Sequence, residues 1–115
     1  MIYVKDFERM TAFYGGTLGL KAIEKTRLDN WVEFDTGGAR FSLHAIPQAI
    51  AEGIAISSPP VPRETSAVKL TFEVVDAASE RARLEALGVT IIERPWGSWD
   101  AVDPEGNIFQ IRGAQ

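Results

Sequence analysis

The chain has 115 residues and a mass of 12.6 kDa, which is enough for one domain. Sixteen acidic residues against twelve basic ones give a net charge of −4, so the sequence lacks the basic surface that nucleic-acid binding needs. It contains no cysteine, which excludes disulfides, thiolate metal ligands and cysteine nucleophiles. No apolar run approaches the ~20 residues of a membrane span, and charged residues stand where a signal peptide has its apolar stretch. We therefore expect a cytoplasmic protein without nucleic-acid or membrane partners.

The sequence repeats itself once. Residues 18–25 read LGLKAIEK and residues 87–94 read LGVTIIER, an offset of 69 (87 minus 18). Further matches follow in the same order at an offset of 68, and they pair Trp31 with Trp99, Gly38 with Gly106 and Phe41 with Phe109. Small changes in offset are typical of loop insertions between two copies of one structural unit.

The first copy predicts a strand, a helix and three further strands. Asp6 follows the first strand and is well suited to cap a helix, which we expect to end at Gly15-Gly16. Alternating apolar residues and turn residues define the strands. The expected strands are residues 1–5, 20–26, 30–35 and 39–45.

The second copy predicts the same βαβββ order. Asp76 caps the expected helix 77–87, and Gly88 ends it. The expected strands are residues 68–75, 89–94, 98–102 and 107–112. We expect a single domain, residues 1–115, made of module 1 (1–45), a linker (46–65) and module 2 (66–115). The proline-rich linker is either a connection or a lid over the site.

Three local patterns give the chain a family resemblance. They are VKDFERMTAFY at residues 4–14 before Leu18-Gly19-Leu20, Pro95-Trp96-Gly97, and DPEGNIFQI at residues 103–111. With the duplicated βαβββ unit, the chain resembles the vicinal oxygen chelate superfamily, which includes glyoxalase I, bleomycin resistance proteins and extradiol dioxygenases. The resemblance implies an α+β fold in which two tandem βαβββ modules form a curled mixed sheet around a cleft. Such clefts are often completed by a second chain, so we expect a homodimer.

Strand alternation separates the two faces of each sheet without help from the family. Apolar residues such as Leu43 and Phe109 share one parity and must face the helices. The opposite parity then faces the cleft, unless a bulge near Asp100 reverses Trp99. The expected ligand-binding residues are Tyr3, Trp31, Arg40, Ser42, His44, Lys69, Thr71, Glu73, Trp99, Gln110 and Arg112.

The resemblance implies a histidine on the first strand of each module and a carboxylate on the last, together holding a divalent ion. Carried over, these positions fall on Ser42, Lys69 and Gln110, and the remaining one would precede Met1. A hydroxyl, an ammonium and an amide are poor ligands. We therefore expect no metal at these positions and no cofactor.

Lys69 and His44 are the candidates for catalysis. Lys69 would supply a fixed positive charge for a carboxylate, phenolate or enolate, or else be a solvated lysine paired with Glu73. His44 would act as a base near neutral pH, or else be a polar residue whose hydrogen bonds are satisfied.

The sequence favours a small-molecule binding protein that uses no metal. The alternative is an enzyme of the same superfamily, either a lyase, isomerase or dioxygenase with atypical metal ligands (His44, Glu33 and Glu73) or a metal-free catalyst assisted by Lys69. A structural protein with a vestigial cleft is the third interpretation. The edges of strands 1–5 and 68–75 need partners, which pairing between the modules would supply, either within one chain or across the two chains of a homodimer.

Overall fold

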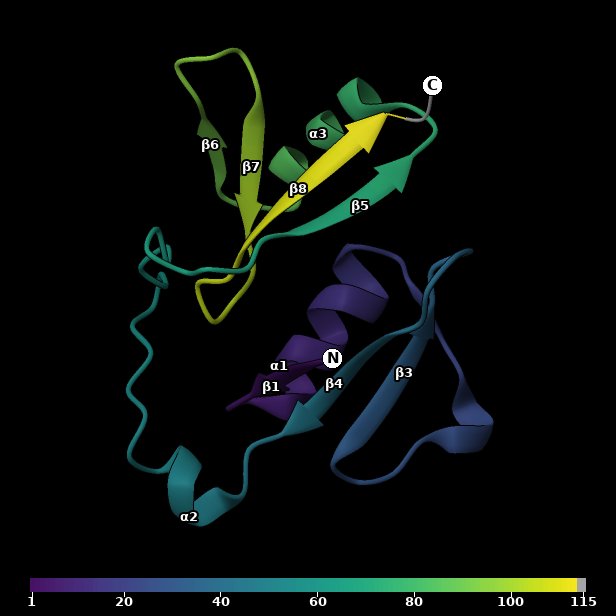
Figure 1. The fold of residues 1–115 in the computed structure, drawn as a ribbon, viewed down its shortest axis with the longest axis vertical. Helices are drawn as coiled ribbons and strands as arrows, with labels where there is room; N and C mark the ends of the chain where they lie inside the picture. Colours follow the sequence, from purple (N-terminus) through teal and green to yellow (C-terminus); the bar gives the residue numbers. More distant parts are fainter. Residues whose placement is uncertain (114–115) are drawn as a thin grey trace. The chain divides into compact units, whose positions relative to one another are not determined.

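The structure is a computed structural model that describes residues 1–113. The chain divides into two compact units, Met1–Ser57 and a second that begins at Ser58, so the boundary lies inside the expected linker. Each unit contains a four-stranded mixed sheet with helices, which is the expected α+β class (Figure 1). None of the helices within residues 1–113 has the length and apolar character needed to cross a membrane.

The first unit is built on a sheet with the strand order β1-β4-β3-β2. Strand β1 runs parallel to β4, and the other neighbours are antiparallel. The helix that follows β1 has contacts with β4. The elements in chain order are β1 (Ile2–Val4), α1 (Phe7–Thr11), η1 (Ala12–Thr17), β2 (Lys21–Ala22), η2 (Glu24–Thr26), β3 (Trp31–Asp35), β4 (Phe41–Ala45) and α2 (Gln48–Ala51).

The second unit repeats this topology with the order β5-β8-β7-β6. Strand β5 is parallel to β8, while β8, β7 and β6 are antiparallel neighbours. The duplication read from the sequence therefore corresponds to two copies of one βαβββ fold. Its elements are β5 (Leu70–Val74), α3 (Ala77–Ala86), β6 (Ile91–Glu93), β7 (Trp99–Val102) and β8 (Ile108–Gly113).

Both expected aspartate caps are present. The Asp6 carboxylate accepts a hydrogen bond from the backbone N–H of Arg9 at 3.1 Å, and Asp76 accepts one from the N–H of Ser79 at 3.1 Å. These bonds satisfy N–H groups that have no partner within the helix. The backbone and hydroxyl hydrogen bonds from Ser79 lower the pKa of Asp76, which keeps this cap ionised.

The expected helix end at Gly15-Gly16 is wrong. The chain continues through both glycines as the π-helix η1, and the left-handed residue comes later, at Gly19 with φ +84°. Gly15 has a packing role instead, because a Cβ there would lie 3.3 Å from the ring of Phe34. The second copy agrees with the prediction. Gly88 (φ +84°) donates to the Glu85 carbonyl and the next residue donates to the Leu84 carbonyl, a Schellman motif.

The expected strand 20–26 is shorter in the structure. Lys21 and Ala22 pair with β3 and the Ile23 N–H still donates to the Glu33 carbonyl at 2.8 Å, whereas residues 24–26 form a 3₁₀ helix. The Thr26 hydroxyl donates to the Ile23 carbonyl at 3.2 Å, a local bond that competes with strand pairing.

Each sheet buries one face. In the first unit the residues of that face are fully buried or nearly so: Val4, Val32, Phe34, Phe41 and Leu43. In the second unit Ala101, Phe109 and Ile111 are buried on β7 and β8, and helix α3 adds Leu84. Helix α3 has contacts with β8, as the helical segment of the first unit has with β4. The predicted separation of apolar and polar faces is confirmed for β4 and β8.

The turn between β7 and β8 is tied to part of the expected linker. The Asp103 carboxylate accepts hydrogen bonds from the N–H groups of Glu105 and Asn107 at 2.9 and 3.0 Å. Arg63 donates from its backbone to the Gly106 carbonyl and from Nε to the Glu105 carbonyl, at 2.8 and 3.1 Å. Arg63 is therefore hydrogen-bonded to the β7–β8 turn of the second unit, although Val61 and Arg63 are exposed.

Gly106→Ala tests this contact. Gly106 has φ +86°, and an added Cβ would lie 2.4 Å from the Val61 carbonyl oxygen. We expect the free energy of unfolding to fall by about 2–4 kcal/mol, from ~1 kcal/mol for the left-handed backbone plus ~1–3 kcal/mol for overpacking. Gly97→Ala is the matched control, because Gly97 has φ +93° but no atom within 4 Å. Urea unfolding in which both variants lose the same free energy would contradict this account.

Candidate functional site

Three rings lie side by side across the polar face of the first sheet. His44 on β4 is the register partner of both Tyr3 on β1 and Trp31 on β3. Tyr3 stacks on His44 with ring centroids 5.3 Å apart, and Trp31 meets His44 edge-on at 5.5 Å. We call these residues the aromatic row. Tyr3 is 60% exposed, so one end of the row offers an open ring face.

A carboxylate adjoins this row. Glu33 accepts a hydrogen bond from Trp31 Nε1 at 3.4 Å and forms an ion pair with Arg40 at 3.4 Å. Ser42 is the register partner of Glu33 and is buried. Five of the expected site residues, Tyr3, Trp31, Arg40, Ser42 and His44, therefore belong to one region of the first unit.

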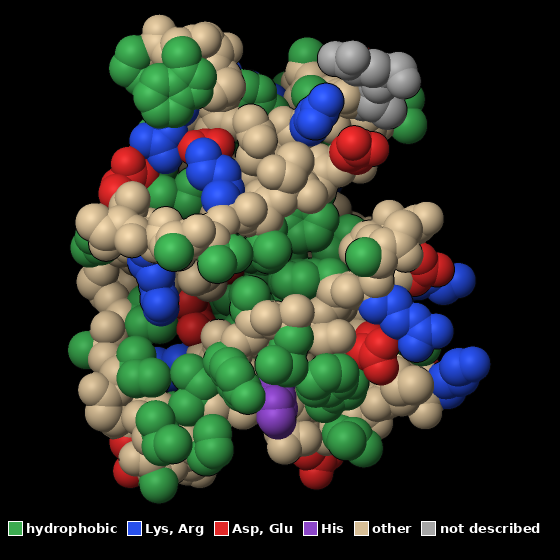
Figure 2. Space-filling model, viewed as in Figure 1, with side chains coloured by type: hydrophobic (Ala, Val, Ile, Leu, Met, Phe, Trp, Pro, Cys, Tyr) green, Lys and Arg blue, Asp and Glu red, His purple; other side chains and the backbone are tan. Residues whose placement is uncertain are grey.

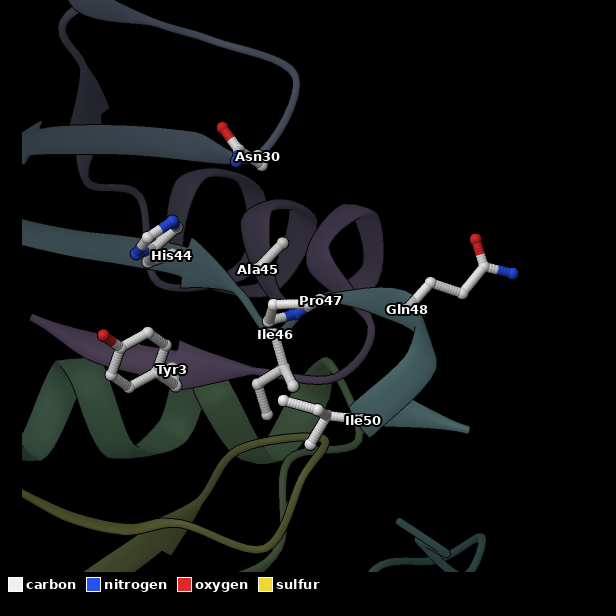
Figure 3. Close-up of a pocket in the computed structure, with 8 residues that line it drawn as sticks. All are labelled: Tyr3, Asn30, His44, Ala45, Ile46, Pro47, Gln48 and Ile50. Carbon is white, nitrogen blue, oxygen red and sulfur yellow. The ribbon is translucent and has the colours of Figure 1, made fainter. Parts of the chain in front are cut away.

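A pocket of about 800 Å³ opens beside the aromatic row. It lies at the end of β4 and extends over the following segment to helix α2, and its lining residues are Tyr3, Asn30, His44, Ala45, Ile46, Pro47, Gln48 and Ile50. In Figure 3 the Ile46 and Ile50 side chains lie close together while Gln48 points away from them. Hydrophobic side chains surround the single histidine on the face shown in Figure 2. A mostly apolar wall with a few polar groups suits an organic ligand.

The polar face of the second sheet carries different chemistry. Gln110 on β8 is the register partner of Thr71 on β5 and of Asp100 on β7. The Thr71 hydroxyl donates to Gln110 Oε1 at 3.3 Å. Glu73 and Arg112 are partners in the next rows of the same two strands, and both are exposed.

An ion network crosses this face, and we call it the Lys69 network. Lys69 Nζ lies 2.9 Å from Asp100 Oδ2, and Arg94 Nε lies 2.8 Å from the same oxygen. Arg94 also binds both oxygens of Glu64, at 2.9 and 3.0 Å. The hydrogen bonds with Glu64 and Asp100 raise the pKa of Arg94, and the bond from Arg94 lowers the pKa of Glu64. Lys69 thus has Asp100 as its ion-pair partner, where the sequence suggested Glu73.

Trp99 lies on the other face of the second sheet. It shares the parity of buried Ala101, and the Arg81 guanidinium on helix α3 lies 5.7 Å from its ring centroid. The pairing of Asp100 with Gln110 corresponds to that of Glu33 with Ser42, so Asp100 is the counterpart of Glu33. The expectation that Trp99 shares the face of Trp31 was wrong, because matching Trp31 to Trp99 is out of register by one residue; the sequence had left this reversal open.

Asp100 is the residue that the sequence analysis missed. Its side chain is only 1% exposed, yet it is charged and lies on the polar face. The face of Asp100 could have been predicted from the strand pairing. Residues paired across neighbouring strands lie on the same face, and Asp100 pairs with Gln110.

The residues at the positions where the resemblance implies a metal do not fit a divalent ion. Ser42 offers a hydroxyl, Gln110 an amide, and Lys69 an ammonium that is already bound to Asp100. Within residues 1–113, no group of three or more histidine, cysteine, aspartate or glutamate side chains is placed to hold a metal. A divalent ion prefers several oxygen or imidazole ligands, so no step is assigned to a metal here.

Comparisons with known proteins agree with this fold. The family model of the glyoxalase-like domain matches residues 1–112. A glyoxalase/bleomycin resistance protein/dioxygenase family enzyme from Burkholderia phytofirmans PsJN is similar in structure, with 25% identity, coverage of 99% of this chain and 94% of that one, and a TM-score of 0.65. A comparison with curated proteins gives no match.

Two further structures share the fold at lower identity. A bleomycin resistance determinant encoded on the transposon Tn5 is 20% identical, with coverage of 99% and 94% and a TM-score of 0.66. TnmS3, an antibiotic binding protein from Streptomyces sp. CB03234, is 21% identical, with coverage of 99% and 91% and a TM-score of 0.64. The family match spans nearly the whole chain, and the chain therefore belongs to the glyoxalase-like domain family of the vicinal oxygen chelate superfamily.

Proposed function

We propose that the protein binds a small planar organic molecule against the aromatic row of its first unit, without a metal ion. The observation that carries this proposal is the row of Tyr3 stacked on His44, with Trp31 edge-on to His44, beside a pocket of about 800 Å³. Ring faces bind planar ligands through stacking and burial of apolar area. Such a ligand would stack on the exposed ring of Tyr3.

The polar groups near the row would orient the ligand. Glu33 accepts hydrogen bonds, and Asn30 at the pocket wall can donate and accept them. Two structural neighbours are described as a bleomycin-binding protein in complex with bleomycin and as an antibiotic binding protein, which supports the same class of ligand for this chain. Binding alone would then be the function, as in proteins that sequester a compound.

The enzyme alternative depends on Lys69 or on relocated metal ligands. A relative of 25% identity is described as an enzyme, and Lys69 has an ammonium held beside a buried carboxylate. Of the relocated ligands, His44 and Glu33 belong to the first unit and Glu73 to the second. The first proposal is favoured because the aromatic row and its pocket lie together in one unit.

A tryptophan fluorescence titration tests the proposed binding. We expect at least one member of a panel of planar aromatic antibiotics to quench the fluorescence saturably in buffer that contains EDTA. Trp31→Leu should weaken that binding roughly two- to twelvefold, from the ~0.5–1.5 kcal/mol of a ring–ring contact. Trp96→Leu is the control, because Trp96 is an exposed residue of the β6–β7 turn and lies outside the aromatic row. No saturable quenching by any compound, or an equal effect of both variants, would contradict the proposal.

The homodimer is part of this proposal, and the cytoplasmic location stays a prediction. Strands β1 and β5 each stand at the end of their sheet, so each presents an edge that a second strand can pair with. Multi-angle light scattering at micromolar concentration is expected to give twice the chain mass of 12.6 kDa. A mass equal to that of one chain across the concentration range would contradict the dimer.

A further inference from the structure

The Lys69 network places a charged group where burial is nearly complete. The Asp100 side chain is 1% exposed, and its Oδ2 atom receives both the Lys69 ammonium and the Arg94 guanidinium. Burying a carboxylate is costly unless cations and hydrogen bonds compensate for the lost water. Arg94 also binds Glu64, so the two bases and two acids of the network balance in formal charge.

Arg94 and Lys69 differ in their exposure and in the number of carboxylates that they bind. The Arg94 side chain is 14% exposed and its nitrogens bind two carboxylates. The Lys69 side chain is 43% exposed, and within residues 1–113 its ammonium donates to Asp100 alone. An ammonium has three N–H donors, so two of them are free for another acceptor.

Asp100 is not fully satisfied by this arrangement. Its second oxygen, Oδ1, is buried and has no hydrogen-bond partner among residues 1–113. Because Arg94 is shared between Glu64 and Asp100, the Lys69 ammonium supplies the second positive charge that balances the two carboxylates. The Lys69–Asp100 pair also holds the exposed ammonium in one position, which lowers the entropy cost of binding to it.

The second donor on the same face is the amide nitrogen of Gln110. The oxygen of this amide accepts a hydrogen bond from the hydroxyl of Thr71, which lies two residues after Lys69. Within residues 1–113 the amide nitrogen of Gln110 has no hydrogen-bond partner, because the only bond of that side chain is the one to its oxygen. The register places Gln110 next to Asp100, so ammonium and amide N–H donors share this surface.

We propose that this face of the second unit binds the carboxylate group of an organic ligand through the Lys69 ammonium, with the Gln110 amide as the second donor. A carboxylate has two oxygens that accept such bonds, and bonds between charged groups are stronger than those between neutral ones. If the network only stabilised the unit, replacing Lys69 would not change the affinity for carboxylates.

The experiment compares benzoate with benzyl alcohol, which matches it in size but has no charge. Each is titrated into the full chain, and backbone amide shifts are followed by NMR. We expect benzoate to shift the amides of Lys69, Leu70 and Gln110 saturably, while benzyl alcohol leaves them unchanged. Lys69→Met should weaken benzoate binding about tenfold or more, equivalent to ~1.4 kcal/mol, and Lys69→Arg should keep it within about threefold.

Lys25→Met is the matched control, because Lys25 is an exposed lysine of the 3₁₀ helix in the first unit. It should bind benzoate as the unchanged protein does. The proposal is overturned if benzoate causes no saturable shift at Lys69, if benzyl alcohol causes the same shift, or if folded Lys69→Met protein retains full affinity. Because Lys69→Arg keeps the charge, it separates loss of binding from loss of the fold. Failure here leaves the aromatic-row proposal standing, since the readouts lie in different units.

Discussion

One-sided burial governs this structure, because each sheet has a helix packed on one face and strand residues alternate between faces. Phe41 and Leu43 are buried on the helix side of β4, so Ser42 and His44 must lie on the other side. The same constraint on β8 buries Phe109 and assigns Gln110 to the polar face. The positions of the candidate binding residues therefore follow from the packing of the core, and a shift of one strand by one residue would move that strand's binding residues to the buried face.

The two units use equivalent positions for different chemistry. Glu33 and Asp100 are counterparts in the register, yet Glu33 lies beside an aromatic row while Asp100 lies in an ion network. His44 in the first unit stacks with Tyr3, whereas the second unit has no ring at the corresponding face positions. The duplicated fold thus presents one surface suited to planar apolar groups and one suited to anionic groups. Function is carried by these side chains, since the scaffold is common to both units.

Short-range interactions made several elements of the fold predictable from the sequence. The aspartate caps, the glycine at the end of α3 and the buried faces follow from short-range rules. The errors arose where packing decides. The helix continues through Gly15, which lies against Phe34, and reaches its left-handed residue only at Gly19; no sequence pattern indicates a π-helix here. The faces of Trp99 and Asp100 were assigned the wrong way round, because matching two repeats does not determine the strand register to within one residue. The partner of Lys69 lies 31 residues away, beyond the reach of a spacing rule.

The central claim is that this member of the glyoxalase-like family binds its ligand with aromatic and charged side chains and without a metal ion. The most direct test is elemental analysis of protein purified without chelator or histidine tag, combined with thermal-shift scans in nickel, zinc, manganese and iron(II). We expect far less than one metal ion per chain and an unchanged Tm with every ion, because Ser42, Lys69 and Gln110 offer no suitable ligand set. Metal near one ion per chain or per dimer, with a Tm that rises with that ion, would contradict the account.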